Sequence, residues 1–324
     1  MQDLAGRIAV ITGGGTGMGR ELARQLVAEG CNVAMCDVSA AAMAETKRLC
    51  EVERLPQGLR ITTHLADVSN EEDVKRFADE VARQQDTDRI HLLFNNAGVA
   101  GGGSMIAHER SEWERTFNIC WFGVYYCTRA FLPMMLKADK GHIVNTSSVN
   151  GFWASVGPIV PHTAYCAAKF AVKGFTEALQ TDLRMNAPHI KCSVVMPGHI
   201  GTSIVTNSRK IQAGHDSPDF TPKELAQMRA RVASMGVDVS ELSDEDIGRR
   251  AHERARRFLE DAPTSASEAA KIILDGVKAE RWRILVGKDA EKIDRLVREA
   301  PERAYDVDFF QTLAREVGWK LGAN

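Results

Sequence analysis

The sequence predicts an α/β fold built on a doubly wound parallel sheet of about seven strands, with helices on both faces. The first observation is that short apolar runs alternate with helix-forming segments, the order that gives parallel strands joined by right-handed crossovers. The second is that the first run, residues 7–12, is almost uniformly apolar and suits a strand buried on both faces. The third is that a glycine-rich turn follows this run directly.

The expected elements follow in order along the chain. Strands are predicted at residues 7–12, 32–36, 60–65 and 90–94, through Ile143 and Val144, and at residues 191–196 and 283–286. Helices are predicted after Gly19, at residues 40–54, 70–85 and 119–136, around Tyr165, and at residues 265–278, 288–298 and 308–321.

A turn rich in glycine connects the first strand to the first helix. It reads Gly13-Gly14-Gly15-Thr16-Gly17-Met18-Gly19. A strand, a glycine loop and a helix in this order favour phosphate binding, because bare backbone can approach a diphosphate and the helix N-terminus supplies N–H groups and positive potential. The alternative is a glycine-rich turn that binds no ligand.

The second expected strand ends at Asp37, 18 residues after Gly19. An acidic residue at this place can accept hydrogen bonds from both ribose hydroxyls of adenosine, and its charge repels a 2′-phosphate. Asp37 therefore favours NAD over NADP. Thr16 adds no basic side chain that would bind that phosphate.

Tyr165 and Lys169 form a Y-x-x-x-K pair on a predicted helix. Residues four apart share a helix face, so the two side chains point the same way. A free tyrosine has a pKa near ~10, and a neighbouring ammonium lowers it, which suits proton transfer in a reaction. Ser148, at the end of the preceding strand, can hold an oxygen in front of Tyr165. Taken alone, the pair would more often be exposed and without a role, so it gains weight only beside a cofactor site.

Together these motifs resemble the short-chain dehydrogenase/reductase family, in the subgroup with a T-G-x-x-x-G-x-G loop and Y-x-x-x-K. The resemblance runs from about residue 4 to residue 202 and resumes near Ser265. It implies a Rossmann-type fold, NAD as the cofactor and a homodimer or homotetramer.

The resemblance also implies catalytic roles. Tyr165 would be the base, and Lys169 would bind the nicotinamide ribose and lower the tyrosine pKa. Ser148 would polarise the substrate oxygen; Ser147 competes for this role, but the family glycine follows the catalytic serine by three residues, as Gly151 follows Ser148. Asn118, inside the fourth expected helix, would hold a water in a proton relay, although a buried asparagine that only bonds backbone would look the same.

The family's cofactor-binding positions fall along the whole first part of the chain. Asp67 would border the adenine, while Ile200 and Thr202 would bind the carboxamide. The full set is Gly13, Thr16, Gly17, Met18, Gly19, Asp37, Asp67, Val68, Asn95, Ala97, Gly98, Tyr165, Lys169, Pro197, Gly198, Ile200 and Thr202. For each of these the alternative is ordinary packing.

Two segments depart from the family pattern. The spacing between Ser148 and Tyr165 is longer than the family usually has, and the extra residues fall within 152–161. This run is apolar and contains two prolines, which stiffen it. We expect it to form a pocket wall, or else a loop packed on its own sheet. Residues 203–263 form an insert with helix starts at Thr221 and Ser243. We expect a helical lid on the substrate side, or else an oligomer contact. The chain is otherwise one domain, 1–324, with C-terminal helices at about 288–324.

Composition narrows the function classes. A net charge of −2 gives no case for nucleic acid or an anionic membrane, and the most apolar segment is interrupted by Arg129 and Pro133. Seven cysteines without a C-x-x-C motif suggest thiols that pack in a reducing cytoplasm. The histidines show no spacing typical of a metal site. The local arginine cluster at residues 249–257 is interrupted by glutamates and predicts a solvated helix face.

The predicted function is an NAD-dependent oxidoreductase acting on a secondary alcohol or ketone. Phe152, Trp153, Met105, Ile106 and the insert indicate a hydrophobic, bulky substrate. The alternatives are an NADPH-preferring ketone reductase and a non-catalytic, NAD-sensing binding protein.

Overall fold

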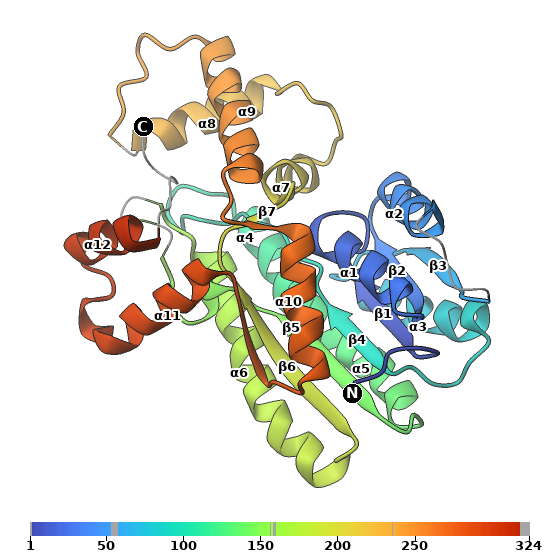
Figure 1. The fold of residues 1–324 in the computed structure, drawn as a ribbon. Coiled ribbons are helices and arrows are strands. Elements are labelled where there is room, and N and C mark those ends of the chain that lie inside the picture. Colours follow the sequence, from blue (N-terminus) through green and yellow to red (C-terminus); the bar gives the residue numbers. More distant parts are fainter. Residues whose placement is uncertain (1, 53–57, 156, 158–159, 235, 318–324) are drawn as a thin grey trace.

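A computed structural model describes residues 2–52, 58–155, 157, 160–234 and 236–317. Its centre is a seven-stranded parallel sheet with the strand order β3-β2-β1-β4-β5-β6-β9 (Figure 1). The strands are β1 (Ile8–Thr12), β2 (Asn32–Asp37), β3 (Ile61–Leu65), β4 (Leu92–Asn95), β5 (Gly141–Thr146), β6 (Ile190–Pro197) and β9 (Arg283–Val286). The prediction of a doubly wound parallel sheet is confirmed.

Helices cover both faces of the sheet. On one face lie α1 (Gly17–Ala28), α2 (Ala40–Val52) and α10 (Ala266–Lys278), and on the other lie α3 (Glu71–Gln85), α5 (Gly123–Met135) and α6 (Thr163–Asn186). Side chains of β1 alternate between the two cores: Ala9 and Ile11 pack under the first layer, and Val10 packs under the second. This is why the run at residues 7–12 carries apolar side chains on both sides.

The helix that carries Asn118 is interrupted. The sequence predicts a regular helix there, but the structure has α4 (Arg110–Phe117), a π-helical turn at Asn118–Phe122, and then α5. The N–H of Gly123 donates to the carbonyl of Asn118, five residues earlier, where an α-helix would use a residue four earlier. One extra residue is thereby accommodated, and such π turns are frequent at functional sites.

The insert is helical, as predicted. It contains three helices, whereas the sequence predicts two helix starts. It contains α7 (Ile204–Ala213), α8 (Pro222–Ser234) and α9 (Asp244–Glu260), between the short paired strands β7 (Ile200–Gly201) and β8 (Thr264–Ser265). Figure 1 shows these three helices beyond the carboxyl ends of the sheet strands. Helix α7 starts after Ser203, whose side chain makes no capping hydrogen bond.

The C-terminal helices α11 (Lys288–Glu299) and α12 (Val307–Val317) enclose Trp153. The indole N–H donates to the carbonyl of Ala304 at 2.6 Å, its ring stacks on Phe310 at 6.3 Å, and its exposed fraction is 0%. The expectation that Trp153 lines a substrate pocket is therefore wrong. The C-terminal helices supply an apolar cover for this residue, and nothing in the local sequence places them there.

No described helix combines the length and the apolar composition that crossing a membrane requires. All seven cysteines are free thiols with buried side chains. Within the described ranges, histidine, cysteine and acidic side chains do not gather in groups of three or more that could hold a metal ion.

Candidate active site

The glycine turn lies where the carboxyl ends of β1 and β4 meet, and close approach of the backbone requires its glycines. Gly13 has φ +67°, and a Cβ there would lie 2.9 Å from the Cα of Ala97. A Cβ on Gly19 would lie 2.0 Å from the carbonyl oxygen of Gly13. The Thr12 hydroxyl accepts from the N–H of Ala97 at 3.0 Å, which fixes the turn against the loop after β4. The Thr16 side chain does not cap α1, so the first N–H groups of this helix are not used by a side-chain cap and would suit a diphosphate.

Asp37 lies at the end of β2 beside this turn. Its carboxylate accepts from the N–H of Gly15 and from the N–H of Ser39, both at 3.0 Å. The nearby cation, Arg20, instead donates to the carbonyl of Gly15 and to the Thr46 hydroxyl. The carboxylate is thus held at the place where a ribose would follow a diphosphate on the turn.

Asp67 and Val68 follow β3 at the same edge. The Asp67 carboxylate accepts from the Ser69 N–H at 2.9 Å and from the Ser69 hydroxyl at 2.7 Å. Val68 is buried, and a Cβ on Gly123 would lie 2.7 Å from its side chain. Asp67 and Val68 already make these contacts within the protein. Only their remaining atoms could border an adenine.

Asn95 directs its side chain into the core. Its side-chain amide donates to Asn145 at 2.8 Å and to Thr128 at 3.1 Å, inside the layer between the sheet and α5. Because this side chain is buried, the predicted contact of Asn95 with a cofactor would have to come from its main chain. Along β4 the side chains alternate between faces, and Asn95 falls on the α5 face. Only its main chain remains near the cofactor edge, as do those of Ala97 and Gly98.

The two candidate serines after β5 have different surroundings. The Ser147 hydroxyl donates to the carbonyl of Lys169 at 2.7 Å and serves to attach α6 to the strand end. Ser148 instead hydrogen-bonds Tyr165. A Cβ on Gly151 would lie 2.1 Å from the Ser147 hydroxyl oxygen and 2.7 Å from the Lys169 carbonyl, so this glycine permits the close approach of α6.

Tyr165 and Lys169 share the inner face of α6. Burial raises the Tyr165 pKa above its usual value, while the hydrogen bond from Ser148 acts in the opposite direction. Burial also lowers the pKa of Lys169, whose ammonium donates to the carbonyl of Thr146 at 2.8 Å and lies 5.4 Å from the centre of the tyrosine ring. Desolvation thus outweighs the lowering of the tyrosine pKa that the sequence predicts, and the Lys169 ammonium is directed at a carbonyl.

The π turn places further groups beside Lys169. The Cys120 thiol donates to the carbonyl of Val99 at 3.3 Å. A Cβ on Gly98 would lie 3.6 Å from the Lys169 amine and 3.7 Å from the Cys120 sulfur. Asn118 begins this turn, and its main-chain carbonyl is directed to Gly123.

Sequence reasoning missed His162. This residue precedes α6, and its ring lies 4.8 Å from the ring of Tyr165. The available signal was its spacing, since a residue three positions before a helical tyrosine lies beside it.

The segment after β6 completes the edge. The main-chain N–H of His199 donates to Asp289 at 2.7 Å, and a Cβ on Gly198 would lie 2.3 Å from the same carboxylate. Ile200 is buried in β7, and a Cβ on Gly17 would lie 3.2 Å from the Thr202 side chain. The structure thus brings Thr202 onto the start of α1. Pro197 closes β6 and pairs with β9, and Met18 packs against the adjoining core.

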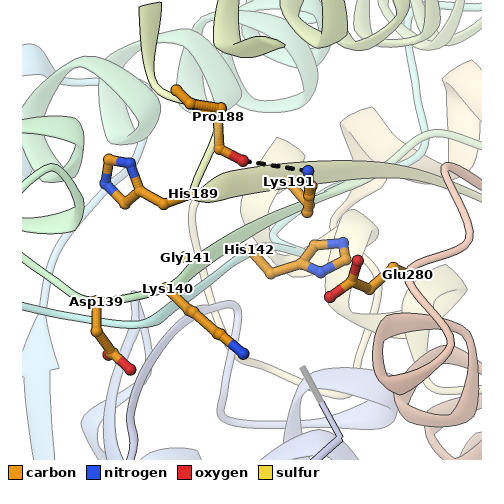
Figure 2. Close-up of a pocket in the computed structure, with 8 residues that line it drawn as sticks. All are labelled: Asp139, Lys140, Gly141, His142, Pro188, His189, Lys191 and Glu280. Atoms are coloured by element: carbon orange, nitrogen blue, oxygen red, sulfur yellow. Dashed lines mark hydrogen bonds between the residues drawn. The ribbon is translucent and has the colours of Figure 1, made fainter.

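Figure 2 shows a hollow at the opposite end of the sheet, lined by His142, Glu280 and Lys191 among others. The His142 Nε2 pairs with Ser193 at 2.7 Å, and its Nδ1 has no hydrogen-bond partner among the described residues. None of the predicted site residues lines it. Doubly wound sheets bind ligands at the carboxyl ends of their strands, so this hollow is separate from the candidate site.

Comparison with known proteins agrees with the geometry. The sequence profile described as short chain dehydrogenase matches residues 7–213. A Mycobacterium tuberculosis protein named as an oxidoreductase, SadH, is 33% identical over 298 residues, which is 92% of each chain. The meso-2,3-butanediol dehydrogenase of Serratia marcescens is 32% identical over 237 residues, 70% of this chain and 87% of that protein.

A solved structure extends the similarity to the whole fold. A short-chain dehydrogenase/reductase from Burkholderia phymatum, crystallised with NAD, has a TM-score of 0.74 at 28% identity and covers 93% of this chain and 96% of its own. The fold of this family binds a nicotinamide cofactor, and the glycine turn and strand ends described above fit one. The protein belongs to the short-chain dehydrogenase/reductase family of oxidoreductases.

Proposed function

We propose that this protein is an NAD-dependent oxidoreductase that transfers a hydride between nicotinamide and a secondary alcohol or ketone. The observation that carries the proposal is the convergence of Ser148, Tyr165 and Lys169 at the strand edge that also holds the glycine turn. When bound at this edge, a nicotinamide cofactor supplies or accepts the hydride.

The protein's own residues handle the proton and the orientation. In oxidation, the carbinol carbon would lose a hydride while the Tyr165 phenolate takes up the hydroxyl proton. In reduction, the Tyr165 hydroxyl would give this proton back as the carbonyl carbon receives the hydride. Ser148, already bonded to Tyr165, would donate to the substrate oxygen and hold it in front of the tyrosine. Lys169 would exchange its bond to the Thr146 carbonyl for the nicotinamide ribose, and Asn118 would hold a water that connects the site to solvent.

Asp37 supports NAD as the cofactor in preference to NADP. Its carboxylate borders the glycine turn, where it would accept from ribose hydroxyls and repel a 2′-phosphate. Arg20, the cation beside it, already donates to Gly15 and Thr46, and Val38, which follows Asp37, is uncharged.

The insert would act as a lid. Helix α7 is tied to the sheet side, because Asn207 donates to Thr16 at 3.0 Å and Ser208 accepts from the N–H of Ala100 at 2.8 Å. Helix α8 has no buried residue among those described, and α9 has only Ile247 and Gly248. These two helices could therefore move over a substrate while α7 stays in place.

A hydrophobic, bulky substrate remains the proposal. The loop after β4 lies against the start of α6, since the N–H of Thr163 donates to the carbonyl of Gly103 at 3.0 Å. Its tip exposes Met105 and Ile106, which a substrate or the lid could cover. Trp153 no longer supports this proposal, because it is enclosed elsewhere.

We also propose a homodimer or homotetramer in the cytoplasm. Tyr125 on α5 and Phe170 on α6 are exposed, and a symmetric contact between these helices would bury both. Seven free thiols suit a reducing compartment. Sedimentation of the purified protein tests the oligomer, and a monomer at assay concentration contradicts it.

Purified protein assayed with NAD or NADP against small polyols and cyclic or aromatic secondary alcohols tests the main proposal. We expect reduction of NAD with the ring-bearing alcohols. Preference for NADP would favour the ketone-reductase alternative. Tight NAD binding without turnover of any alcohol or ketone would favour an NAD-sensing protein, and faster turnover of polyols would contradict a bulky substrate.

A further inference from the structure

His199 joins two parts of the molecule that are far apart in the sequence. It lies in the segment after β6 that also carries Ile200 and Thr202, the residues predicted to bind the carboxamide of the cofactor. Its imidazole Nε2 lies 2.7 Å from the carbonyl oxygen of Phe258, in the last turn of α9. Because a carbonyl can only accept, this nitrogen carries the proton and donates. The two rings also pack at 4.4 Å, and the exposed fraction of His199 is 5%.

The main chain of the same segment is held from a second side. The buried carboxylate of Asp289, in the first turn of α11, accepts from the N–H of His199 at 2.7 Å. A Cβ on Gly201 would lie 2.7 Å from the carbonyl oxygen of Leu259, and β7 pairs Gly201 with Ser265 of β8. The segment and the base of α9 are therefore in direct contact, so a shift of one must displace the other.

The far end of the segment reaches the glycine turn. A Cβ on Gly17 would lie 3.2 Å from the Thr202 side chain, and the Asn207 amide donates to the Thr16 hydroxyl at 3.0 Å. A cofactor with its diphosphate on this turn and its carboxamide against Thr202 would contact both the turn and the segment. The proposed cofactor site and the base of α9 thus share one run of backbone, residues 198–202.

Away from its base, α9 is held less firmly. In Figure 1 it runs from the outer end of the insert down toward β7. Of the residues described in α9, only Ile247 and Gly248 are buried. Three of its arginines are exposed and pair with acids of their own helix, as predicted for a solvated face: Arg249 with Asp246, and both Arg256 and Arg257 with Glu253. Movement of the insert would therefore pivot at the base of α9, where Phe258 meets His199.

We propose that His199 is a positioning residue that couples cofactor binding to the proposed lid. With NAD or NADH held at residues 198–202, the bond from the imidazole to Phe258 would fix the base of α9 and favour the closed arrangement of α8 and α9. Coupling of this kind is a free energy shared between two sites, and it typically changes an affinity about 5–150-fold. The inference rests on the proposed function and adds how its lid is controlled.

Hydrogen exchange of the full chain, with and without saturating NADH, tests the coupling. The quantity compared is the factor by which NADH slows exchange of the amides of α9. In the unmodified protein we expect a factor of at least about five. In His199→Phe, which keeps a ring against Phe258 but loses the donor, the factor should fall to about one. His199→Gln places an amide N–H near the position of Nε2 and should restore most of it. A merely structural role would speed exchange equally with and without NADH and leave this factor unchanged.

His252→Phe is the matched control. It makes the same substitution on α9 itself, where the His252 ring packs 4.8 Å from the ring of Phe220 and not against the cofactor segment. It should keep the effect of NADH. If His199→Phe does not fold, His199→Asn replaces it, because the shorter side chain cannot reach the Phe258 carbonyl.

The possible failures are distinguishable. No slowing of exchange in α9 when the unmodified protein binds NADH, or an unchanged factor in His199→Phe, would overturn the inference and leave the proposed function standing. Failure to bind NAD or NADH at all would overturn the proposed function instead.

Steady-state kinetics give a second measurement. With the alcohol that the unmodified protein turns over best, His199→Phe should raise KM about fivefold or more and leave kcat nearly unchanged, because it removes binding through the lid and leaves the proton-transfer groups in place. A fall in kcat at unchanged KM would assign His199 to the chemical step and overturn the inference.

Discussion

The catalytic edge and the insert are held in place by different kinds of interaction. At the edge, backbones approach so closely that Gly13, Gly19 and Gly151 leave no room for a Cβ, and Ser147 and Lys169 are tied to main-chain carbonyls. In the insert, α8 and α9 bury little and are held largely by exposed ion pairs such as Arg229 with Asp244. Exposed pairs contribute only about 0–1 kcal/mol each. Rigid packing therefore positions the groups that we propose transfer the proton, whereas the segment that we propose as a lid is held loosely.

The largest effect should come from Tyr165→Phe at the rigid edge. Only the oxygen that transfers the proton is removed, so turnover should fall on the order of 10²–10⁴-fold while NAD affinity and the unfolding midpoint remain. Steady-state kinetics and cofactor titration check this. Tyr125→Phe, on the exposed side of α5, is the control and should change little. A variant that keeps more than about a tenth of the rate would exclude Tyr165 as the base.

Gly151→Ala should show how little space the catalytic edge leaves for one added side-chain carbon. Its Cβ would meet the Ser147 hydroxyl and the Lys169 carbonyl, so α6 must shift, at a cost of about 1–3 kcal/mol in unfolding free energy and a lower kcat. Gly174 lies within α6, and a Cβ there would meet nothing within 4 Å. Gly174→Ala should therefore stabilise the protein by about 0.5–1 kcal/mol. Denaturant unfolding measures both. Equal effects of the two substitutions would mean that the edge is not tightly packed.

Asp37→Ala tests the adenosine end of the edge. Removing an acceptor for ribose and a charge that repels a 2′-phosphate should weaken NAD binding and narrow the NAD/NADP preference by about tenfold or more. Titrations of both cofactors decide this. An unchanged preference would show that Asp37 does not contact the adenosine ribose.

The smallest effect should come from Ser243→Ala, and it tests the insert directly. Ser243 caps α9 by accepting from the Asp246 N–H at 3.1 Å, and such caps contribute about 0.5–2 kcal/mol. Because α9 buries little, we expect faster hydrogen exchange across α9 with no change in global unfolding.

Ser265→Ala removes the same capping interaction from α10, whose inner face packs into the core through Ala269 and Ile273. This control should lower the global unfolding free energy. If Ser243→Ala lowered it equally, the insert would be as firmly packed as the sheet, and the proposed lid would lose its physical basis.

The sequence by itself determined the sheet, the glycine turn and the pair of Tyr165 and Lys169. These features are local: an apolar run forms a buried strand, a turn needs residues without a Cβ, and a spacing of four fixes one helix face. The starts of α9 and α10 also follow from local capping residues, Ser243 and Ser265.

Only the tertiary structure decided where other side chains point. Asn95 turns into the layer beneath α5, and Trp153 is enclosed by a residue 151 positions later in the chain. Burial in the folded chain likewise raises the Tyr165 pKa, which the spacing of Tyr165 and Lys169 does not predict. In each case the deciding contact joins parts of the chain whose approach no local pattern encodes.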